Sequence, residues 1–585
     1  MRTLAKDTVS ASGRSVTVKG WVNSRRDHGG LIFIDLRDHT GVVQLAIRPE
    51  QSEAFKLGEG LRDEFVISAT GQVADRGEGL RNPNLATGSV EIKVDQLEIL
   101  NRSEALPIQI EGTAQANEEL RLKYRFLDLR RPKMQRMLKK RAEYYAAMRK
   151  YVEERDFVEV TTPILANSSP EGARDFLIPS RVHPGKFYAL PQAPQQFKQL
   201  LMVGGVPRYY QLAACFRDED PRADRLYGEF YQLDLEMSFV EDGEEVRSTM
   251  EPLIKQLVTD FAGKKLFTED IPRISYTEAM ERYGTDKPDL RFGIELTELT
   301  EELKDTEFGV FKNAECVKAI CVKGAGELSR SQIDKFTEIA KSEGAGGLAY
   351  LTYKDGEIQS PIAKFLKSGE LEAIKNKLGA QDGDIVFFGA DKRSTVNKVL
   401  GRLRNEFADH FELKDPGVIA LCWIVDFPFY ELDEKTGKLD FGHNPFSMPK
   451  GGLQALESAQ TDEEKLKIVA DQYDIVLNGY ECCSGAVRNH NPEIMYKAFG
   501  ILGFDKEYVD SHFGAMINAF KYGAPPHAGC AFGVDRMFMV LMDESNIREI
   551  VAFPKNGSGV DVMMQAPNTA AIEQLDELNL HIVEH

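Results

Sequence analysis

The stretches Cys215-Phe-Arg217-Asp-Glu219-Asp220 and Ala531-Phe-Gly-Val-Asp-Arg536 each set one arginine beside acidic and aromatic residues. Arginine carries a permanent charge on a planar fork that binds phosphate oxygens in pairs, so two such forks suit a polyphosphate. The chain has no Gly-x-x-x-x-Gly-Lys-Ser/Thr loop, which is the usual backbone cradle for phosphates. A protein that handles ATP without that loop must use side chains. Taken singly, each arginine is interpreted as a surface ion pair, because 28% of the residues are charged.

A third stretch, Asp156-Phe-Val-Glu-Val-Thr-Thr-Pro163, precedes these two. In this order the three resemble motifs 1, 2 and 3 of the class II aminoacyl-tRNA synthetases, with motif 2 continuing through Phe230-Tyr-Gln-Leu-Asp-Leu-Glu236. The resemblance extends over nearly the whole chain and is strongest to bacterial-type aspartyl-tRNA synthetases. It implies ATP-dependent attachment of L-aspartate to tRNA in two steps: formation of aspartyl-adenylate, then transfer to the 3′ end of the tRNA.

The bulk composition predicts a multidomain protein of the cytoplasm. A chain of 585 residues exceeds what one hydrophobic core usually serves, so we expect three or four domains. Seven scattered cysteines form neither a disulfide framework nor a paired C-x-x-C zinc site, which favours a reducing compartment. The N-terminus lacks the apolar core of a signal peptide, and no run approaches membrane-spanning length. We expect tRNA and L-aspartate as partners, and neither DNA nor a membrane.

The charge distribution is uneven. The formal net charge is -19, which is unexpected for a protein that must bind a polyanion. However, residues 1–105 are close to neutral, and residues 106–145 carry a local excess of five positive charges, among them Arg121, Arg125 and Arg130. This basic segment would suit an RNA, but an amphipathic helix with a basic solvent face would have the same composition. The charge pattern alone does not decide between the two.

The first hundred residues are typical of a small β-barrel. Five short runs rich in β-branched and aromatic residues are separated by Gly, Asp and Asn turns. These runs are Val16–Val22, Leu31–Leu36, Gly41–Ile47, Phe65–Val73 and Val90–Leu97. Five such strands suit an OB-fold barrel, a fold that commonly binds oligonucleotides across one face. The pattern alone would also permit an SH3-like barrel or a small sandwich.

We predict an α+β multidomain protein overall. An OB-fold anticodon-binding domain would occupy residues 1–105, followed by a hinge at 106–132 and a helix that begins near Pro132. By the resemblance, a class II antiparallel-sheet catalytic domain would comprise 133–282, with motifs 1 and 2, and 411–585, with motif 3 and a C-terminal extension. Residues 283–410 change in composition and contain no motif residue, so we expect an inserted α/β domain there, as in bacterial-type relatives. Its role cannot be interpreted from the sequence.

The resemblance assigns the ATP site. Activation of an amino acid is an in-line displacement at the α-phosphorus, so positioning and charge neutralisation provide the catalysis. Arg217 would hold the α-phosphate and the amino-acid carboxylate, and Arg536 the γ-phosphate; these are the two expected catalytic residues. Asp474 and Glu481 offer the oxygen ligands that Mg²⁺ prefers, although their spacing alone is ordinary. Further expected ATP contacts are Asp218, Glu219 at the adenine, Glu481, Gly533, Val534 and Asp535.

The resemblance also assigns an aspartate site. Selection of aspartate requires cations for the β-carboxylate, for which Lys198 and Arg488 are expected, and acceptors for the α-ammonium. An arginine fork rejects asparagine because the amide NH₂ of asparagine cannot accept a hydrogen bond. His443 resembles a histidine that contacts the substrate in this family, although a lone histidine near a proline is more often an ordinary loop residue. The remaining expected contacts are Gln195 and Asp234 at the ammonium, Arg217 at the α-carboxylate, His443, and Glu171 on a loop that would close over the substrate.

Two segments depart from the commoner family pattern. Arg225-Leu-Tyr-Gly-Glu-Phe230 replaces a segment one residue shorter in which a glutamine contacts ATP. Leu226 cannot make such a contact, so we do not assign it to the site. Glu481-Cys-Cys-Ser-Gly485 replaces a glycine-rich run, and its two thiols would be expected to make activity sensitive to oxidation.

The barrel carries the expected anticodon contacts. Phe33 resembles the aromatic residue on which the middle anticodon base stacks, although an aromatic in an alternating strand usually belongs to the core. Gln44 and Glu91 match positions that recognise base edges. The arginines expected at the tRNA backbone are Arg25, Arg26 and Arg76.

Two further loop residues bear on tRNA choice. His28 and Gly79 resemble the pair found in the relaxed subtype, which attaches aspartate to both tRNA-Asp and tRNA-Asn. The alternative is a strict enzyme that charges tRNA-Asp only.

Motif 1 lies at a subunit interface in relatives, so we expect a homodimer. Two other hypotheses are an asparaginyl or lysyl synthetase with the same core, which the cations Lys198 and Arg488 disfavour, and a synthetase-derived RNA-binding protein without catalysis.

Overall fold

The computed structural model describes residues 2–112, 116–168, 172–433 and 436–583. The chain divides into two compact units, Met1–Arg136 and Met137–His585. In these described ranges, no helix is long and apolar enough to cross a membrane.

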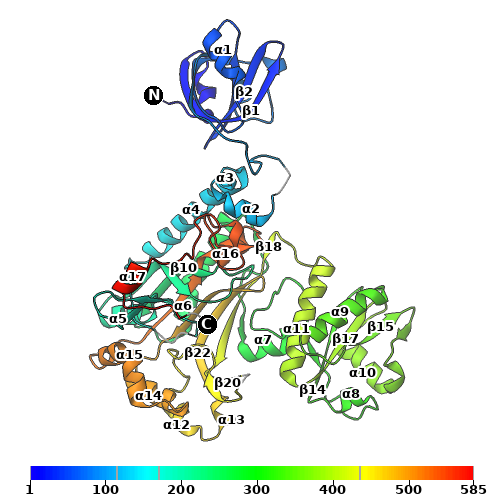
Figure 1. Ribbon diagram of the computed structural model, residues 1–585. Helices are drawn as coiled ribbons and strands as arrows, with labels where there is room; N and C mark the ends of the chain where they lie inside the picture. Colours follow the sequence, from blue (N-terminus) through cyan, green and yellow to red (C-terminus); the bar gives the residue numbers. More distant parts are fainter. Residues whose placement is uncertain (1, 113–115, 169–171, 434–435, 584–585) are drawn as a thin grey trace. The chain divides into compact units, whose positions relative to one another are not determined.

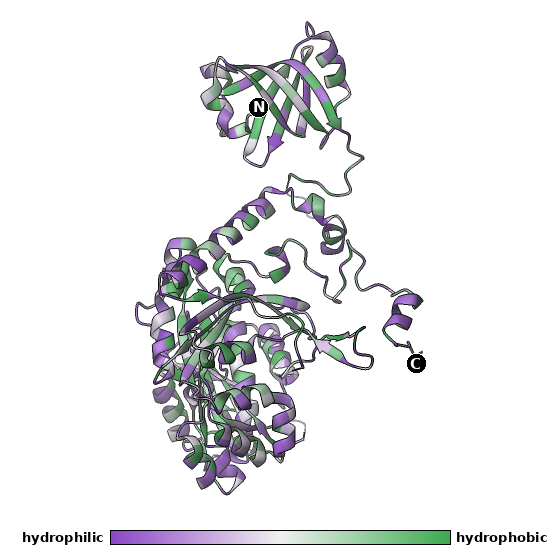
Figure 2. Cartoon of the chain, turned by 90° about the vertical axis from the view of Figure 1, so that its left-hand side faces the viewer, coloured by the Kyte–Doolittle hydropathy of each residue, from purple (hydrophilic) through white to green (hydrophobic). Residues whose placement is uncertain are grey.

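Within the described part of the first unit, five strands close into a barrel in the order β1-β2-β3-β5-β4 (Figure 1). Their bounds are β1 (Ser15–His28), β2 (Leu31–Asp38), β3 (Gly41–Ile47), β4 (Val66–Asp75) and β5 (Val90–Asn101), with η1 (Ala5–Ala11), α1 (Ser52–Glu59) and η2 (Glu78–Leu80) beside them. Hydrophobic and hydrophilic residues alternate along the strands (Figure 2), and Ile32 and Ile34 are fully buried inside. The predicted barrel is confirmed, and the sandwich alternative was wrong.

The basic segment after the barrel forms α2 (Glu118–Lys123), α3 (Arg125–Asp128) and the start of α4 (Pro132–Glu153). Arg121 and Arg125 both donate to the buried carboxylate of Asp128, at 3.0 and 2.6 Å. Arg130 donates to Glu64 at 2.8 Å. These three of the ten basic residues of the segment therefore pair with buried carboxylates of the same unit. Asp128 is already counted in the excess of five, so of these pairings only that of Arg130 with Glu64 lowers the charge that the segment can offer to an RNA.

The second unit is built on a long sheet. In the part that the structure describes, eight strands follow the order β12-β19-β22-β23-β24-β10-β9-β6. The pairs at the two edges, β12–β19 and β6–β9, are parallel, and the others are antiparallel. The bounds are β6 (Val158–Glu159), β9 (Arg208–Arg217), β10 (Gly228–Ser238), β12 (Arg273–Ser275), β19 (Leu421–Pro428), β22 (Val469–Leu477), β23 (Tyr480–Val487) and β24 (His527–Gly533).

One face of this sheet packs against α4, α6 (Gly243–Gln256) and α16 (Val534–Leu541) in the largest hydrophobic core. Because side chains alternate along a strand, Leu233 and Leu235 of β10 enter this core while Asp234 and Glu236 lie on the opposite face. The alternation thus separates an apolar face that holds the fold together from a charged face that is available for chemistry.

A separate sheet lies in the segment predicted as an insert. Among the described residues its order is β13-β14-β17-β15-β16, with helices on both faces (Figure 1). Phe387 packs against α9 and α11, and the next residue, Phe388, packs against α8 on the other face. The mixed helix and strand content predicted for this segment is confirmed, and its strand pairs are antiparallel. The bounds are β13 (Thr297–Glu298), α8 (Gly309–Lys312), β14 (Cys316–Val322), α9 (Arg330–Ser342), β15 (Ala349–Lys354), β16 (Glu357–Gln359), α10 (Ser368–Leu378), β17 (Ile385–Asp391) and α11 (Arg393–His410).

The remaining elements surround the long sheet or connect its strands, except η4, which belongs to the inserted segment. The most important for the site is α5 (Gln195–Val203), which contacts β9, β10 and α15. The others are β7 (Leu177–Pro179), β8 (Phe187–Ala189), η3 (Leu257–Phe261), β11 (Lys265–Leu266), α7 (Tyr276–Tyr283), η4 (Ala363–Phe365), β18 (Val418–Ile419), β20 (Tyr430–Leu432), β21 (Leu439–Phe441), α12 (Gly452–Ser458), α13 (Asp462–Lys465), α14 (Pro492–Ile501), α15 (Lys506–Phe520), η5 (Ile547–Glu549) and α17 (Ile572–Glu577).

Candidate active site

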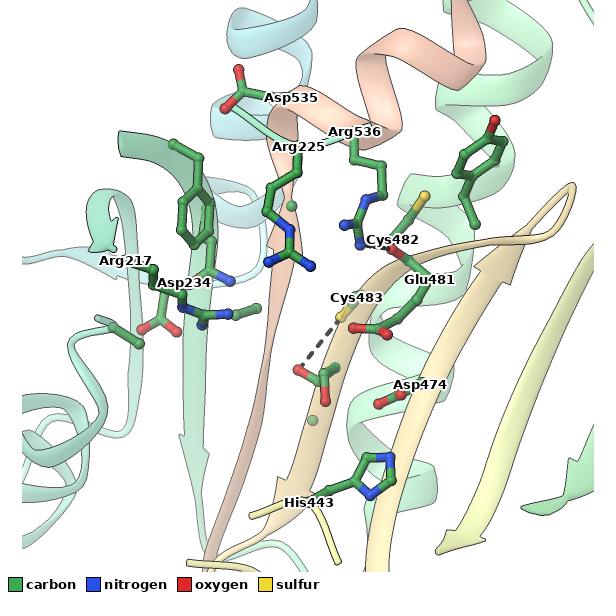
Figure 3. A pocket seen from close by; sticks show the side chains of 18 of the residues that line it. Arg217, Arg225, Asp234, His443, Asp474, Glu481, Cys482, Cys483, Asp535 and Arg536 are labelled. Atoms are coloured by element: carbon green, nitrogen blue, oxygen red, sulfur yellow. Dashed lines mark hydrogen bonds between the residues drawn. The ribbon is translucent and has the colours of Figure 1, made fainter. Parts of the chain in front are cut away.

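A cavity of about 550 Å³ opens on the charged face of the long sheet (Figure 3). It brings together most of the residues predicted for the site, from segments far apart in the chain. Those that line it are Gln195, Lys198, Arg217, Glu219, Asp234, His443, Asp474, Glu481, Arg488, Gly533, Asp535 and Arg536. Asp218 and Val534 are not among the lining residues, and Val534 packs into the core beneath. Glu171 lies outside the described residues.

Four buried charged groups form an ionic network at the cavity. The Lys198 ammonium lies 2.6 Å from Asp234 Oδ1 and 3.4 Å from Glu236 Oε2. Arg488 donates to both oxygens of Glu236, at 2.9 and 3.2 Å. All four side chains are buried, so each charge must be balanced within the network. Two cations and two carboxylates give a net charge of zero before a substrate enters.

The two carboxylates of this network differ in their pKa and in their capacity to accept a further hydrogen bond. Burial would raise the pKa of Glu236, but the charges of Arg488 and Lys198 outweigh it and hold this pKa below its ordinary value. Burial also raises the pKa of Asp234, and there Lys198 opposes it without overcoming it. Within the described part of the chain, the buried Oδ2 of Asp234 has no hydrogen-bond partner. Asp234 therefore has an acceptor to offer to a cationic group in the cavity.

Glu236 was missed as a site residue. It is the last residue of motif 2. The spacing of Asp234 and Glu236 was a usable signal, because residues i and i+2 of a strand share a face. Small residues opposite make room for it: a Cβ at Gly529 would lie 2.2 Å from Glu236 Oε2 and 2.1 Å from the Leu235 carbonyl oxygen. Glycine is required at position 529 for this close approach.

The cavity is also rich in arginine (Figure 3). Arg217 lies at the end of β9, with its guanidinium 5.1 Å from the centre of the Phe230 ring. Among the described residues Arg217 forms no ion pair, and its buried Nε has no hydrogen-bond partner. Arg536, in the first turn of α16, donates to the Glu481 carbonyl oxygen at 2.8 Å and lies 3.2 Å from Asp224. Arg217 is thus the arginine with most capacity for an added anion.

A third arginine was not predicted. Arg225 points into the cavity and donates to Glu219 at 2.6 Å (Figure 3). Arg225 begins the segment that departs from the commoner family pattern. Asp218 accepts from the Tyr227 hydroxyl at 3.2 Å, and its carbonyl oxygen accepts from Arg174. Asp218 therefore fixes the loop between β9 and β10.

Asp535 also has structural contacts. Its carboxylate accepts from the Tyr231 backbone N–H at 2.9 Å and from the Arg141 guanidinium of α4. In Figure 3 this carboxylate points away from Arg225 and Arg536. Its contacts hold α16 against β10 and α4, and thereby hold the neighbouring Arg536 at the cavity.

Asp474 of β22 and Glu481 of β23 lie on the same side of the cavity (Figure 3). Burial, and then the charge of Glu481, raise the pKa of Asp474 well above its ordinary value. Its buried Oδ1 has no partner among the described residues, and Lys287 lies 3.1 Å from Glu481. A buried, unpaired carboxylate oxygen fits a divalent cation. The described ranges contain no group of three or more His, Cys, Asp or Glu placed to hold a metal, so other ligands would be needed.

Cys482 and Cys483 are both buried. Burial raises the pKa of the Cys482 thiol to about 12 and raises that of Cys483 well above its ordinary value. Since the thiolate is the reactive form, buried thiols of high pKa are inert. The structure therefore argues against the sensitivity to oxidation that the sequence suggested.

The barrel places four predicted anticodon contacts on one face. Arg26 pairs with Phe33, and Gln44 pairs with Glu91, across neighbouring strands. Asp35, two residues after Phe33, pairs with Gln44, so all of these side chains share a face. Phe33 is only half-buried and is not part of the barrel core. Phe33 therefore does not follow the usual rule that an aromatic residue in an alternating strand belongs to the core.

Hydrogen bonds hold these side chains in place. Arg26 donates to both oxygens of Asp35, at 2.8 and 2.9 Å, and Gln44 donates to Glu91 at 3.2 Å. Arg25 donates to the Gly58 carbonyl oxygen. Arg76 is half-buried, and its buried Nη1 has no partner within the described residues. His28 and Gly79 are both exposed.

Comparisons with known proteins agree with this architecture. The family model for class II tRNA synthetases (D, K and N) matches residues 117–557, and the model for the OB-fold nucleic acid binding domain matches residues 16–100. This chain belongs to the class II tRNA synthetases (D, K and N). It is 52% identical to the aspartate–tRNA(Asp/Asn) ligase of Chlorobaculum parvum, over 98% of this chain and 94% of the relative. It is 50% identical to the enzyme of the same name from Rickettsia bellii, over 98% and 96%.

Solved structures share the fold at low identity. Asparaginyl-tRNA synthetase from Pyrococcus horikoshii, complexed with asparaginyl-adenylate, has a TM-score of 0.56 at 19% identity, covering 95% of this chain and 98% of that one. Aspartyl-tRNA synthetase from Entamoeba histolytica has a TM-score of 0.56 at 19% identity, covering 95% and 92%. Because these identities are low, the structural likeness supports the fold alone.

The ionic network yields a prediction for stability. Replacement of Glu236 by alanine leaves two buried cations with one carboxylate, so we expect a loss of about 3–5 kcal/mol. Glu229 is a matched control on the same strand: its side chain is 60% exposed and lies 3.6 Å from Lys555. We expect Glu229→Ala to cost less than about 1 kcal/mol. Urea denaturation, with hydrogen exchange of β10 as the local measure, checks this. Equal effects of the two variants would contradict the role of the network.

Proposed function

We propose that this protein attaches L-aspartate to tRNA at the expense of ATP. Its relatives from Chlorobaculum parvum and Rickettsia bellii are named aspartate–tRNA(Asp/Asn) ligases, which supports the amino acid and the tRNA. The observation that carries the proposal is the buried network of Lys198, Arg488, Asp234 and Glu236 beside an arginine-lined cavity. Its two cations suit the side-chain carboxylate of a substrate, and the unpaired oxygen of Asp234 suits the α-ammonium. An amino acid with an acidic side chain has both of these groups, besides the α-carboxylate that reacts.

Aspartate would bind at the network. Arg488 uses Nε and Nη2 on Glu236, which leaves Nη1 for the β-carboxylate, and the Lys198 ammonium has further donors. Gln195 and Asp234 would accept from the α-ammonium. The α-carboxylate would then lie towards Arg217. Selectivity against asparagine would follow because its amide NH₂ would face donors.

The chemical step needs no covalent enzyme intermediate. An α-carboxylate oxygen of aspartate would attack the α-phosphorus of ATP, and pyrophosphate would leave. Arg217 would neutralise charge at the α-phosphate and Arg536 at the γ-phosphate, which is catalysis by positioning and electrostatics. Glu219 would meet the adenine amino group once Arg225 releases it. In the second step the terminal ribose hydroxyl of tRNA would attack the adenylate carbonyl, and AMP would leave.

Asp474 and Glu481 are proposed to hold Mg²⁺, because both offer carboxylate oxygens and Asp474 Oδ1 is buried without a partner. When bound, the ion would help to neutralise the charge of the leaving pyrophosphate. Lys287 pairs with Glu481, so its side chain would have to leave that carboxylate when Mg²⁺ binds, and it could then contact a phosphate.

The barrel face around Phe33, Gln44 and Glu91 is proposed to bind the anticodon, and the exposed His28 and Gly79 to permit both tRNA-Asp and tRNA-Asn. A homodimer through motif 1 is proposed as well. An interface there is supported by exposed apolar residues around the motif, namely Val158, Ile164 and Leu165. The domain boundaries given above remain predictions; OB-fold matching over residues 16–100 supports the first of them.

The substrate assignment predicts a selective defect. Arg488→Ala should raise KM for aspartate about 100-fold, because it truncates one partner of a buried charge pair, and leave KM for ATP within about threefold. ATP–pyrophosphate exchange measures both constants. Arg488→Lys keeps the positive charge without the planar fork, so its KM for aspartate should lie between the values of the natural protein and of Arg488→Ala. Equal changes in both KM values would contradict the assignment of Arg488 to the β-carboxylate, and absence of aspartate-dependent exchange in the natural protein would support the non-catalytic alternative.

The tRNA assignment predicts relaxed specificity. Aspartylation of tRNA-Asp and tRNA-Asn transcripts should proceed with comparable kcat/KM, with a transcript of unrelated anticodon as the inactive control. A preference for tRNA-Asp of a hundredfold, about 2.7 kcal/mol, would instead indicate the strict alternative.

A further inference from the structure

A chain of hydrogen bonds runs from the cavity into the protein. Gln195 and Gln199 lie one turn apart on α5, and Gln195 Nε2 lies 3.1 Å from Gln199 Oε1. Gln199 Nε2 lies 3.1 Å from His527 Nε2, and His527 Nδ1 lies 2.8 Å from the Pro525 carbonyl oxygen. All three side chains are buried. Only Gln195 lines the cavity.

The backbone carbonyl at the far end fixes the direction of every bond in this chain. A carbonyl oxygen can only accept, so His527 Nδ1 carries the hydrogen. In a neutral imidazole Nε2 is then an acceptor, which requires Gln199 to present its NH₂ to His527 and its oxygen to Gln195. Gln195 must in turn give its NH₂ to Gln199. Its own oxygen, Oε1, has no partner among the hydrogen bonds of the described residues and is left for the cavity.

The imidazole is held neutral by its surroundings. Burial lowers the pKa of His527, and the charges of Arg488 and His490 act in the same direction. The charge of Glu236 and the Pro525 carbonyl oxygen oppose them without prevailing. The acceptor at Nε2 is therefore available near neutral pH, and the direction of the chain is set by groups outside the cavity.

We propose that His527 and Gln199 are positioning residues that orient the side-chain oxygen of Gln195 towards the α-ammonium of the amino-acid substrate. This proposal rests on the proposed function, since it concerns the same substrate. Gln195 Oε1 and Asp234 Oδ2 then form a pair of acceptors for one ammonium. Without the acceptor at position 527, Gln199 can turn its amide, and Gln195 can then present its NH₂ to the positively charged group.

Two variants of His527 separate orientation from mere packing. His527→Leu fills the position with an apolar side chain and removes the acceptor, and His527→Gln offers an amide oxygen near the former Nε2. The measurements are KM for aspartate and for ATP in pyrophosphate exchange, and the inhibition constant of succinate, which is aspartate without the amino group. We expect His527→Leu to raise KM for aspartate about tenfold or more, with KM for ATP and the succinate constant within threefold. We expect His527→Gln to return KM for aspartate to within threefold of the natural protein.

Parallel changes in the aspartate and succinate constants, or no change in either, would overturn the proposal. If His527→Leu does not fold, Gln199→Met decides in its place, because it removes the same link at nearly the same volume and should give the same selective rise. If the natural protein itself shows no aspartate-dependent exchange, the proposed function fails and this inference fails with it. Robust exchange in the natural protein combined with unselective variants would overturn the inference alone.

Discussion

The mutual neutralisation of Lys198, Asp234, Glu236 and Arg488 is the constraint on which the rest of the site depends. Four charges are buried against a sheet whose other face is the largest hydrophobic core of the protein. Desolvation makes each of them costly alone, so the strand that carries the carboxylates, the helix that carries Lys198 and the segment that carries Arg488 must come together. Gly529 permits this approach because any side chain there would collide with Glu236.

The charged groups of the cavity are balanced in two different ways. The network has no net charge before a substrate binds. What it can offer to a substrate is a set of unused hydrogen-bonding groups: one acceptor oxygen of Asp234 and donors of Lys198 and Arg488. Among the other arginines of the cavity, Arg217 has no ion-pair partner within the described residues. A neutral network with directional groups favours recognition of one particular molecule. An unpaired positive charge favours a polyanion, which supplies the missing charge itself.

Much of this could be predicted from local patterns. Alternating β-branched residues predicted the barrel strands, and the family resemblance that the three motifs carry implied the catalytic sheet and most of the lining residues. The pairing of Glu236 with Arg488 could not be predicted, because it joins residues 252 positions apart. Nor could the sequence show that Asp128 and Glu64 neutralise Arg121, Arg125 and Arg130, or that Asp535 binds Arg141 and a backbone N–H. Charge counts and motifs name residue types, whereas partners are set by tertiary packing.

The central claim is that the buried network selects an acidic side chain. The most direct test is the ratio of kcat/KM for aspartate to that for asparagine in ATP–pyrophosphate exchange with the natural protein. A site whose buried donors would be left facing an amide NH₂ should give a ratio of about 1,000 or more. A ratio below about ten would contradict the account, because it would mean that Lys198 and Arg488 do not meet the substrate side chain.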